Sequence, residues 1–437
     1  MQKRTNTVLE QITELNVKDM KEKRCQLVEE NAIIGQKNPK DINVEGDTCY
    51  NNPIFNNETT PFQAGTIATT TFCENNTKSK KVIGVNIASK VCIIGSRLRN
   101  KGKNVTCPNH HGKCTANISP DAVIGDEEKW SASVAQQIQS EVKIVGYTGD
   151  GDAKSHQGVS RVTQSKVTHM KDVRHLGNSV RRAVNRANFS AGMFRGTSKC
   201  NLRNRLAMSI KQRCTAELTK AHAVYNGNLN AIKKKMPKII DTIVLCFKGY
   251  CGHSCKTNSL VCCGNYRQAK NFMPSNIKLK MTEADELSLI QCIGIMLSPN
   301  AIENTRFLTS TQKCEAVNRA YQAVNPKTIS NPRSFSGRIH SQIHNLNNGY
   351  TRSILLKSKF LGASLPSRSK VIRQMLATDK RNRRRRDPEV LAKKKLRRFA
   401  SRRQRYELHE KKHYSSGLTD IAPSLNWAKQ MQDHNYV

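Results

Sequence analysis

The sequence predicts a mixed α/β fold in which three antiparallel strands come first and parallel strands follow. Residues 42–47 alternate apolar and polar side chains, and residues 66–72 and 82–87 flank a polar stretch in the pattern of a β-hairpin. Residues 126–139 then place apolar side chains at every fourth position after an acidic start, which is typical of an amphipathic helix. Three strands and a helix are therefore expected in this order.

Two further strands complete the predicted sheet. The apolar run at 142–147 predicts a short strand, residues 155–162 a helix, and residues 167–173 another strand. A helix between two strands is the crossover that joins parallel neighbours. The resulting order, βββαβαβ, is similar to that of an RNase H-like core.

The rest of the chain is predicted to be mainly helical. Residues 8–35 space their apolar side chains at three to four positions, which indicates a helical lead-in. The stretch from Leu176 to Cys314 is too long for a connection and predicts an inserted helical domain. Six segments are expected: a lead-in at 1–40, the first part of the core at 41–175, the insertion at 176–305, a return to the core at 306–370, a basic helical arm at 371–412 and a flexible tail at 413–437.

Charge is the strongest compositional feature of the chain. Its 437 residues contain 73 Lys and Arg against 33 Asp and Glu, which gives a formal charge of +40. Such a surface implies a polyanionic partner, because contacts with phosphates release counterions from a nucleic acid. DNA or RNA is therefore expected. A membrane partner is disfavoured, because the sequence shows no amphipathic anchor, no lipidation signal and no apolar run of about 18 residues.

Four acids occupy positions suited to metal binding. Asp47 closes the first strand segment, Asp150 and Asp152 follow the fourth strand, and Glu315 falls in a helical stretch. In the predicted sheet the ends of the first and fourth strands lie side by side, so Asp47 and Asp150 could share a metal ion. Two divalent ions roughly 3.5–4 Å apart need carboxylates that converge from different elements. The alternative interpretation is that these acids are unrelated surface charges.

Four short strings follow one another along the chain. They are Asp47-Thr48-Cys49-Tyr50-Asn51-Asn52-Pro53 with Thr60–Thr66, then Gly149–Lys154, Asp172-Val173-Arg174-His175 and Lys313–Arg319. In this order they resemble the Mutator-like transposase domain, over roughly residues 40–370. The third string is similar to the signature of Cys or Asp, two residues and His that follows the second acid in related DDE transposases.

The resemblance implies an RNase H-like catalytic domain that cuts DNA at transposon ends and joins the freed 3′-hydroxyl to a target. It implies Mg²⁺, or Mn²⁺, held by an Asp-Asp-Glu triad that falls on Asp47, Asp150 and Glu315, with Asp152 as the alternative second acid. His175 would contact a phosphate or orient a carboxylate, or else make a structural hydrogen bond at a helix start. The expected partner is DNA, bound by one copy or by a homo-oligomer.

Cysteines form one dense group between residues 246 and 263. Five thiols and one imidazole within this stretch suit a tetrahedral Zn²⁺ site, and an insertion with little core would gain stability from the metal. Unpaired structural thiols are the other interpretation. The expected ligands are Cys246, Cys251, Cys255 and Cys262, with His253 and Cys263 as alternates.

A second group lies between the third strand and the first helix of the core. Cys107, Cys114 and a histidine such as His110 have zinc-like spacing, and Cys92 would be the fourth ligand. The sequence therefore offers a candidate second zinc site.

A cationic helix is predicted near the C-terminus. Asp387-Pro388-Glu389 is a favourable helix start, with an acidic N-cap followed by Pro. The basic residues are expected to contact the DNA backbone, to act as a nuclear localisation signal, or to do both. They are Arg383, Arg384, Arg385, Arg386, Lys393, Lys394 and Lys395.

Together these features predict a nuclear, transposase-derived protein that cleaves and transfers DNA strands with metal ions. The N-terminus lacks the apolar core of a signal peptide, which agrees with an intracellular location. Two alternatives remain: a non-catalytic DNA-binding descendant of such an enzyme, and a zinc-bearing RNA-binding protein. The presence of all three acids favours a retained active site.

Overall fold

The computed structural model divides the chain into two compact units, Met1–Asn348 and Gly349–Val437. The structure describes residues 2–51, 65–108, 114–150, 153–194, 199–264, 279–327, 331–363, 365–366, 368–387, 389–394, 396–398 and 400–401.

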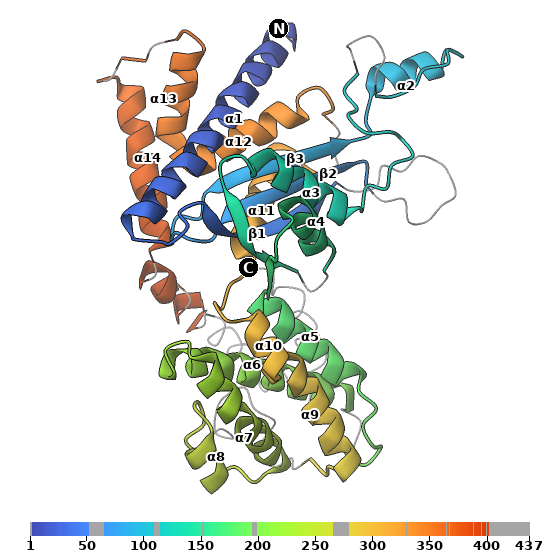
Figure 1. The fold of residues 1–437 in the computed structure, drawn as a ribbon, viewed down its shortest axis with the longest axis vertical. Helices are drawn as coiled ribbons and strands as arrows, with labels where there is room; N and C mark the ends of the chain where they lie inside the picture. Colours follow the sequence, from blue (N-terminus) through green and yellow to red (C-terminus); the bar gives the residue numbers. More distant parts are fainter. Residues whose placement is uncertain are drawn as a thin grey trace, which may run out of the picture. The chain divides into compact units, whose positions relative to one another are not determined.

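A five-stranded mixed sheet, blue to green in Figure 1, forms the centre of the first unit. Its order is β3-β2-β1-β4-β5. β1 pairs with β2 and β2 with β3 in antiparallel fashion, whereas β4 pairs with β1 and β5 with β4 in parallel. The predicted mixed sheet is therefore confirmed. The strands are β1 (Asp41–Tyr50), β2 (Ile67–Glu74), β3 (Val82–Ser89), β4 (Lys143–Gly149) and β5 (Thr168–Lys171).

Two strand ends differ from the prediction. β1 continues to Tyr50, so Asp47 lies inside the strand rather than at its end, because pairing with β2 runs on through Asp47 and Thr71. β5 stops at Lys171, because the Asp172 side chain caps the next helix and draws Val173 into its first turn.

Helices cover both faces of the sheet. On one face, α3 (Glu127–Ile138) packs Val134 and Ile138 against the strands, and α4 (Lys154–Thr163) packs against α3. A Cβ atom on Gly84 of β3 would lie 2.7 Å from Val134, so the close approach of α3 depends on a glycine there. On the other face lie α11 (Gln312–Val324), α12 (Phe335–Asn348) and part of α1 (Gln2–Ile33). The sheet and its covering helices thus come from both ends of the first unit.

The described part of the long segment between β5 and α11 consists of helices joined by turns and loops. It builds a core of its own, which includes Leu206, Ile210, Ile239 and Ile293, all completely buried. Its helices are α5 (Val173–Arg186), α6 (Lys199–Val224), α7 (Leu229–Lys248), α8 (His253–Asn258), α9 (Glu283–Leu297) and α10 (Pro299–Asn304). A short helix, α2 (Ile93–Arg99), follows β3.

The second unit begins with α13 (Tyr350–Phe360) and α14 (Lys370–Arg386), which pack together. The Asp379 carboxylate of α14 accepts a hydrogen bond of 3.0 Å from the Thr351 N–H at the start of α13. After Asp387, the described residues between 389 and 401 are helical again. The Asp387 side chain accepts a 2.9 Å hydrogen bond from the Glu389 N–H, as expected of the predicted helix start.

A candidate active site of converging carboxylates

Asp47 and Asp150 come from neighbouring parallel strands. The ladder between β1 and β4 pairs Glu45 with Thr148, and the same register two residues further on sets Asp47 opposite Asp150. Asp150 directly follows the end of β4. Their charges interact, since Asp150 is among the groups that raise the pKa of Asp47. The first and second predicted acids therefore lie at one place on the sheet.

Glu315 reaches the same region through the docking of α11. The Glu45 side chain, completely buried in β1, accepts a 2.8 Å hydrogen bond from the Cys314 N–H. The Cys314 thiol donates in turn to the Glu45 carbonyl over 3.2 Å. Lys80 forms a 2.9 Å ion pair with the same Glu45 carboxylate. These contacts hold the first turn of α11, which carries Glu315, against the strand that carries Asp47.

His175 joins the second acid to the third. Its Nε2 lies 3.3 Å from Asp150 Oδ1 and 3.3 Å from Glu315 Oε1. Arg174 and Arg319 also pair with the Glu315 carboxylate, at 3.2 Å and 3.6 Å. Asp150 and Glu315 therefore both contact the same imidazole nitrogen.

Asp172 fixes the helix that carries His175. One carboxylate oxygen accepts hydrogen bonds from the N–H groups of Arg174 and His175. The other accepts 2.7 Å and 3.1 Å hydrogen bonds from the N–H and hydroxyl of Thr311, the N-cap residue of α11. A single buried carboxylate thus links the starts of α5 and α11, which position His175 and Glu315.

Asp47 is held on its other side by α11. The Asn318 side-chain amide donates a 2.8 Å hydrogen bond to Asp47 Oδ2, and the Thr48 N–H donates to Oδ1 over 2.9 Å. Burial nevertheless raises the pKa of Asp47 to about 7, and the charges of Asp150 and Glu127 add to the increase. Ionising a buried carboxylate beside other acids is unfavourable, and a bound cation would reduce this free-energy cost.

Glu127 is a fourth acid near this site that the sequence analysis did not single out. Its carboxylate accepts hydrogen bonds from the Tyr50 hydroxyl at 3.0 Å and the Ser155 hydroxyl at 3.2 Å. Its negative charge acts on Asp47. In the sequence Glu127 is one of three consecutive acids at a predicted helix start. Acids are common at helix starts, so the sequence did not mark Glu127 as a site residue.

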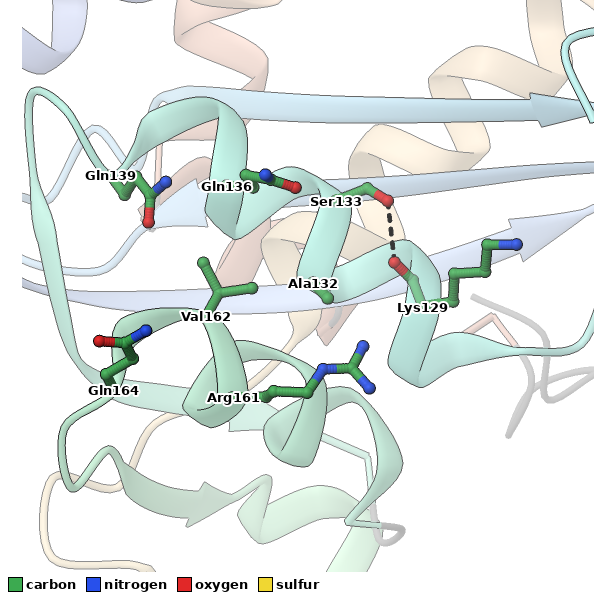
Figure 2. Close-up of a pocket in the computed structure, with 8 residues that line it drawn as sticks. All are labelled: Lys129, Ala132, Ser133, Gln136, Gln139, Arg161, Val162 and Gln164. Atoms are coloured by element: carbon green, nitrogen blue, oxygen red, sulfur yellow. Dashed lines mark hydrogen bonds between the residues drawn. The ribbon is translucent and has the colours of Figure 1, made fainter.

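Asp152, the alternative second acid, lies outside the described residues. Figure 2 shows a shallow pocket between α3 and α4, lined by residues such as Lys129, Gln136 and Arg161. None of Asp47, Asp150, Glu315 and Glu127 lines it. The carboxylate site and this pocket are therefore separate features.

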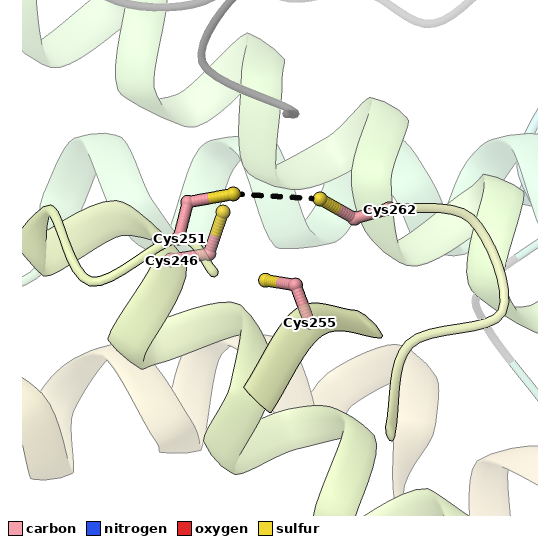
Figure 3. Close-up of side chains that lie close together, drawn as sticks. All are labelled: Cys246, Cys251, Cys255 and Cys262. Carbon is pink, nitrogen blue, oxygen red and sulfur yellow. Dashed lines mark hydrogen bonds between the residues drawn. The ribbon is translucent and has the colours of Figure 1, made fainter. Parts of the chain in front are cut away.

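Two groups of thiols also come together. The sulfur atoms of Cys246, Cys251, Cys255 and Cys262 all lie within 4.8 Å of one another (Figure 3), whereas His253 and Cys263 are exposed and outside the group. The sulfur atoms of Cys92, Cys107 and Cys114 meet the same distance limit, and His110 lies outside the described residues. Both arrangements could hold a metal ion.

The basic residues of the predicted arm are exposed wherever their side chains are described. This holds for Arg383 and Arg384 in α14 and for Lys393 and Lys394 in the following helical stretch. The side chains of Arg385, Arg386 and Lys395 lie outside the described part of the chain. Among the described helices, none combines the length and apolar character needed to cross a membrane.

The fold is a mixed sheet with helices on both faces. Acidic side chains from separate strands and helices lie together at one site on this sheet. The model of the Mutator-like transposase family matches residues 1–263, and the chain belongs to this family. The match includes three of the four strings noted in the sequence, and the string around Glu315 follows it. Searches of curated proteins and of solved structures found no match. Membership in a transposase family implies DNA as the partner.

Proposed function

We propose that the protein is a DNA transposase that cleaves and transfers DNA strands at a site formed by Asp47, Asp150 and Glu315. The observation that carries the proposal is the position of His175, 3.3 Å from both Asp150 and Glu315, while Asn318 of the Glu315 helix donates to Asp47. His175 therefore contacts the second and third acids, and Asn318 ties the first acid to the helix that carries the third. The strand order β3-β2-β1-β4-β5 supports an RNase H-like core beneath it.

The donor set fits hard divalent cations. Asp47, Asp150 and Glu315 offer carboxylate oxygens, which suit Mg²⁺ and Mn²⁺. Burial raises the pKa of Asp47, and the negative charges of Asp150 and Glu127 add to the increase. Such ions would activate the attacking oxygen and stabilise the leaving oxygen of a phosphodiester. Phosphoryl transfer leaves the protein mainly positioning and charge neutralisation.

The chain's own residues have positioning and neutralising roles in this proposal. Asp172 and Glu45 hold the starts of α5 and α11, so that His175 and Glu315 face the strands. Arg174 and Arg319, both more than half exposed and paired with Glu315, are placed to meet a DNA phosphate beside the acids. His175 keeps Asp150 and Glu315 in place before metal binds.

The test is Mn²⁺-supported nicking of supercoiled plasmid by full-length protein. Asp47→Asn should reduce nicking to the level of buffer alone while leaving DNA affinity unchanged. Asp41→Asn is the matched control, because Asp41 begins the same strand at its opposite end and should leave nicking intact. Equal nicking by wild type and Asp47→Asn would contradict the assignment of the site.

Two further comparisons complete this test. Asp150→Asn and Asp152→Asn, assayed side by side, identify the second acid, since only the metal ligand should be indispensable. A wild-type protein that binds DNA but never nicks it with Mn²⁺ or Mg²⁺ would support the second candidate, a non-catalytic transposase-derived DNA-binding protein. The +40 charge favours DNA binding in either case.

We further propose that the protein acts in the nucleus and that the basic arm serves import, DNA binding or both. The exposure of Arg383, Arg384, Lys393 and Lys394 supports this, because both roles need accessible cations.

A further inference from the structure

The four-thiol group of the helical insertion is assembled from separate pieces of chain. Cys246 lies in the last turn of α7, Cys251 follows that helix, Cys255 belongs to α8, and Cys262 lies beyond α8. Their sulfur atoms point toward a common centre in Figure 3, and those of Cys251 and Cys262 are 3.5 Å apart. Cys246, Cys255 and Cys262 are buried. A tetrahedral zinc–thiolate site with bonds of about 2.3 Å has sulfur atoms about 3.8 Å apart, so this spacing fits.

A glycine turn and a set of hydrogen bonds in the intervening backbone position these cysteines. Gly249 adopts φ 111°, in the left-handed region that favours glycine, and so turns the chain sharply between Cys246 and Cys251. On the other side, the Ser259 hydroxyl accepts a 2.7 Å hydrogen bond from the Cys262 N–H. Buried Glu217 accepts a 2.9 Å hydrogen bond from the Leu260 N–H and another from Ser259. Helix α6 therefore holds the loop that carries Cys262.

A buried cation lies beside the sulfur atoms. Arg213 on α6 is completely buried and forms a 2.8 Å ion pair with Glu217. Another arm of its guanidinium reaches Cys246 Sγ at 4.0 Å, and a third donates to Ser259 over 2.9 Å. Burying an arginine is costly unless negative charge surrounds it. Four thiolates around one Zn²⁺ leave a net charge of about −2, and Arg213 stands where it would offset that charge.

We propose that Cys246, Cys251, Cys255 and Cys262 bind one Zn²⁺ as a closed structural site, and that Arg213 is its positioning and charge-balancing neighbour. Four sulfur ligands leave no open coordination position, which is the arrangement of structural zinc rather than of catalytic zinc. Tetrahedral thiolate sites select zinc or iron–sulfur chemistry, and a single ion fits the spacing. The metal would join α7, α8 and the loop held by α6, and so stabilise the insertion that separates His175 from Glu315.

Metal content of the full-length protein tests the site. Purified without chelators, Cys251→Ser and Cys255→Ser should each contain about one zinc per chain less than wild type by elemental analysis. Cys263→Ser is the matched control, because this neighbouring thiol is exposed and outside the group, and it should keep the wild-type content. Cys92, Cys107 and Cys114 are unchanged in all variants, so any metal they hold cancels in the comparison.

Two measurements on unsubstituted protein keep the test decisive if a cysteine variant fails to fold. Co²⁺ added after zinc removal should give the absorption bands of tetrahedral thiolate coordination. Alkylation followed by mass spectrometry should find the four thiols protected until a chelator is added. Wild-type zinc content in both serine variants, or a disulfide between Cys251 and Cys262 in the purified protein, would overturn the proposal.

Zinc release to a chromogenic chelator tests the role of Arg213. Arg213→Lys keeps the positive charge but loses the three-way donor geometry, and release should be roughly 10-fold faster, within the range of outer-shell substitutions. Arg213→Met removes the charge as well and should release zinc faster still. Arg205→Met, an exposed position on the same helix, is the control and should match wild type. Unchanged release in both Arg213 variants would remove Arg213 from the proposal.

Discussion

The Asn318 side chain donates a 2.8 Å hydrogen bond to the Asp47 carboxylate across 271 positions of sequence. The bond joins the helix that carries Glu315 to the central strand of the sheet. The position of Asp47 in the acid cluster therefore depends on the packing of α11 against β1. Substitutions that loosen α11 should affect the site even where they contact no acid.

Asp47→Asn should raise the stability of metal-free protein at neutral and alkaline pH. The pKa of Asp47 is about 7 in the folded chain against an ordinary value of 3.8, so between these pH values the folded state binds one more proton than the unfolded state. Stability is therefore lost as pH rises from about 4 to about 7, and asparagine avoids this loss. We expect a gain of up to about 4 kcal/mol at pH 8, measured by urea unfolding in EDTA, and almost none below pH 4. A loss of stability at pH 8 would show that Asp47 is not destabilising.

Metal affinity should depend on pH because Asp47 must lose its proton to act as a ligand. The affinity for Mn²⁺, measured by calorimetry, should increase as the pH rises through the Asp47 pKa of about 7 and should level off once Asp47 is fully ionised. Glu127→Gln removes a like charge that raises this pKa, so its pH dependence should shift to lower pH. Glu128→Gln, the adjacent residue paired with Arg161, is the control and should leave the profile in place.

Glu45→Ala should destabilise the fold and reduce DNA nicking without touching the acid cluster. It removes the buried acceptor of the Cys314 N–H and the partner of Lys80. We expect a loss of about 2–4 kcal/mol in urea unfolding. Glu315→Gln should abolish nicking but keep a stability close to that of wild type, because the partly exposed ion pairs of Glu315 contribute little to stability. Similar stability for the two variants would contradict the docking role of Glu45.

Neutralising Arg383, Arg384, Arg385 and Arg386 together should weaken DNA binding equally for all sequences. The slope of log affinity against log salt should fall by up to about 0.9 per lost phosphate contact. Exposed Lys37, Lys40, Lys101 and Lys103 provide a control with the same change in net charge. If both sets lower the slope alike, the arm has no special part in binding. A fluorescent fusion of the arm variant separates the import role, since only that role predicts loss from the nucleus.

Periodicity alone was enough to predict the order of strands and core helices. The pattern at 66–87 became the β2–β3 hairpin, and the spaced apolar residues at 126–139 became α3 with Asp126 as its cap. These features depend on neighbours in sequence, which is why composition and spacing reveal them. The ends of β1 and β5 were misplaced, because pairing with β2 and capping by Asp172 decide them.

The sequence by itself determined which side chains are available: acids in or just after strands, thiols at ligand spacing, and an excess of cations. Only the tertiary structure decided which of them meet. The charge of Glu127 acts on Asp47 because α3 packs against β2 and β3, next to β1, and Asn318 reaches Asp47 because α11 packs against β1. Arg213 reaches Cys246 because α6 packs against α7. Such contacts join residues tens to hundreds of positions apart and leave no local period. They follow from the burial of both sheet faces and of the insertion core, which no single segment contains.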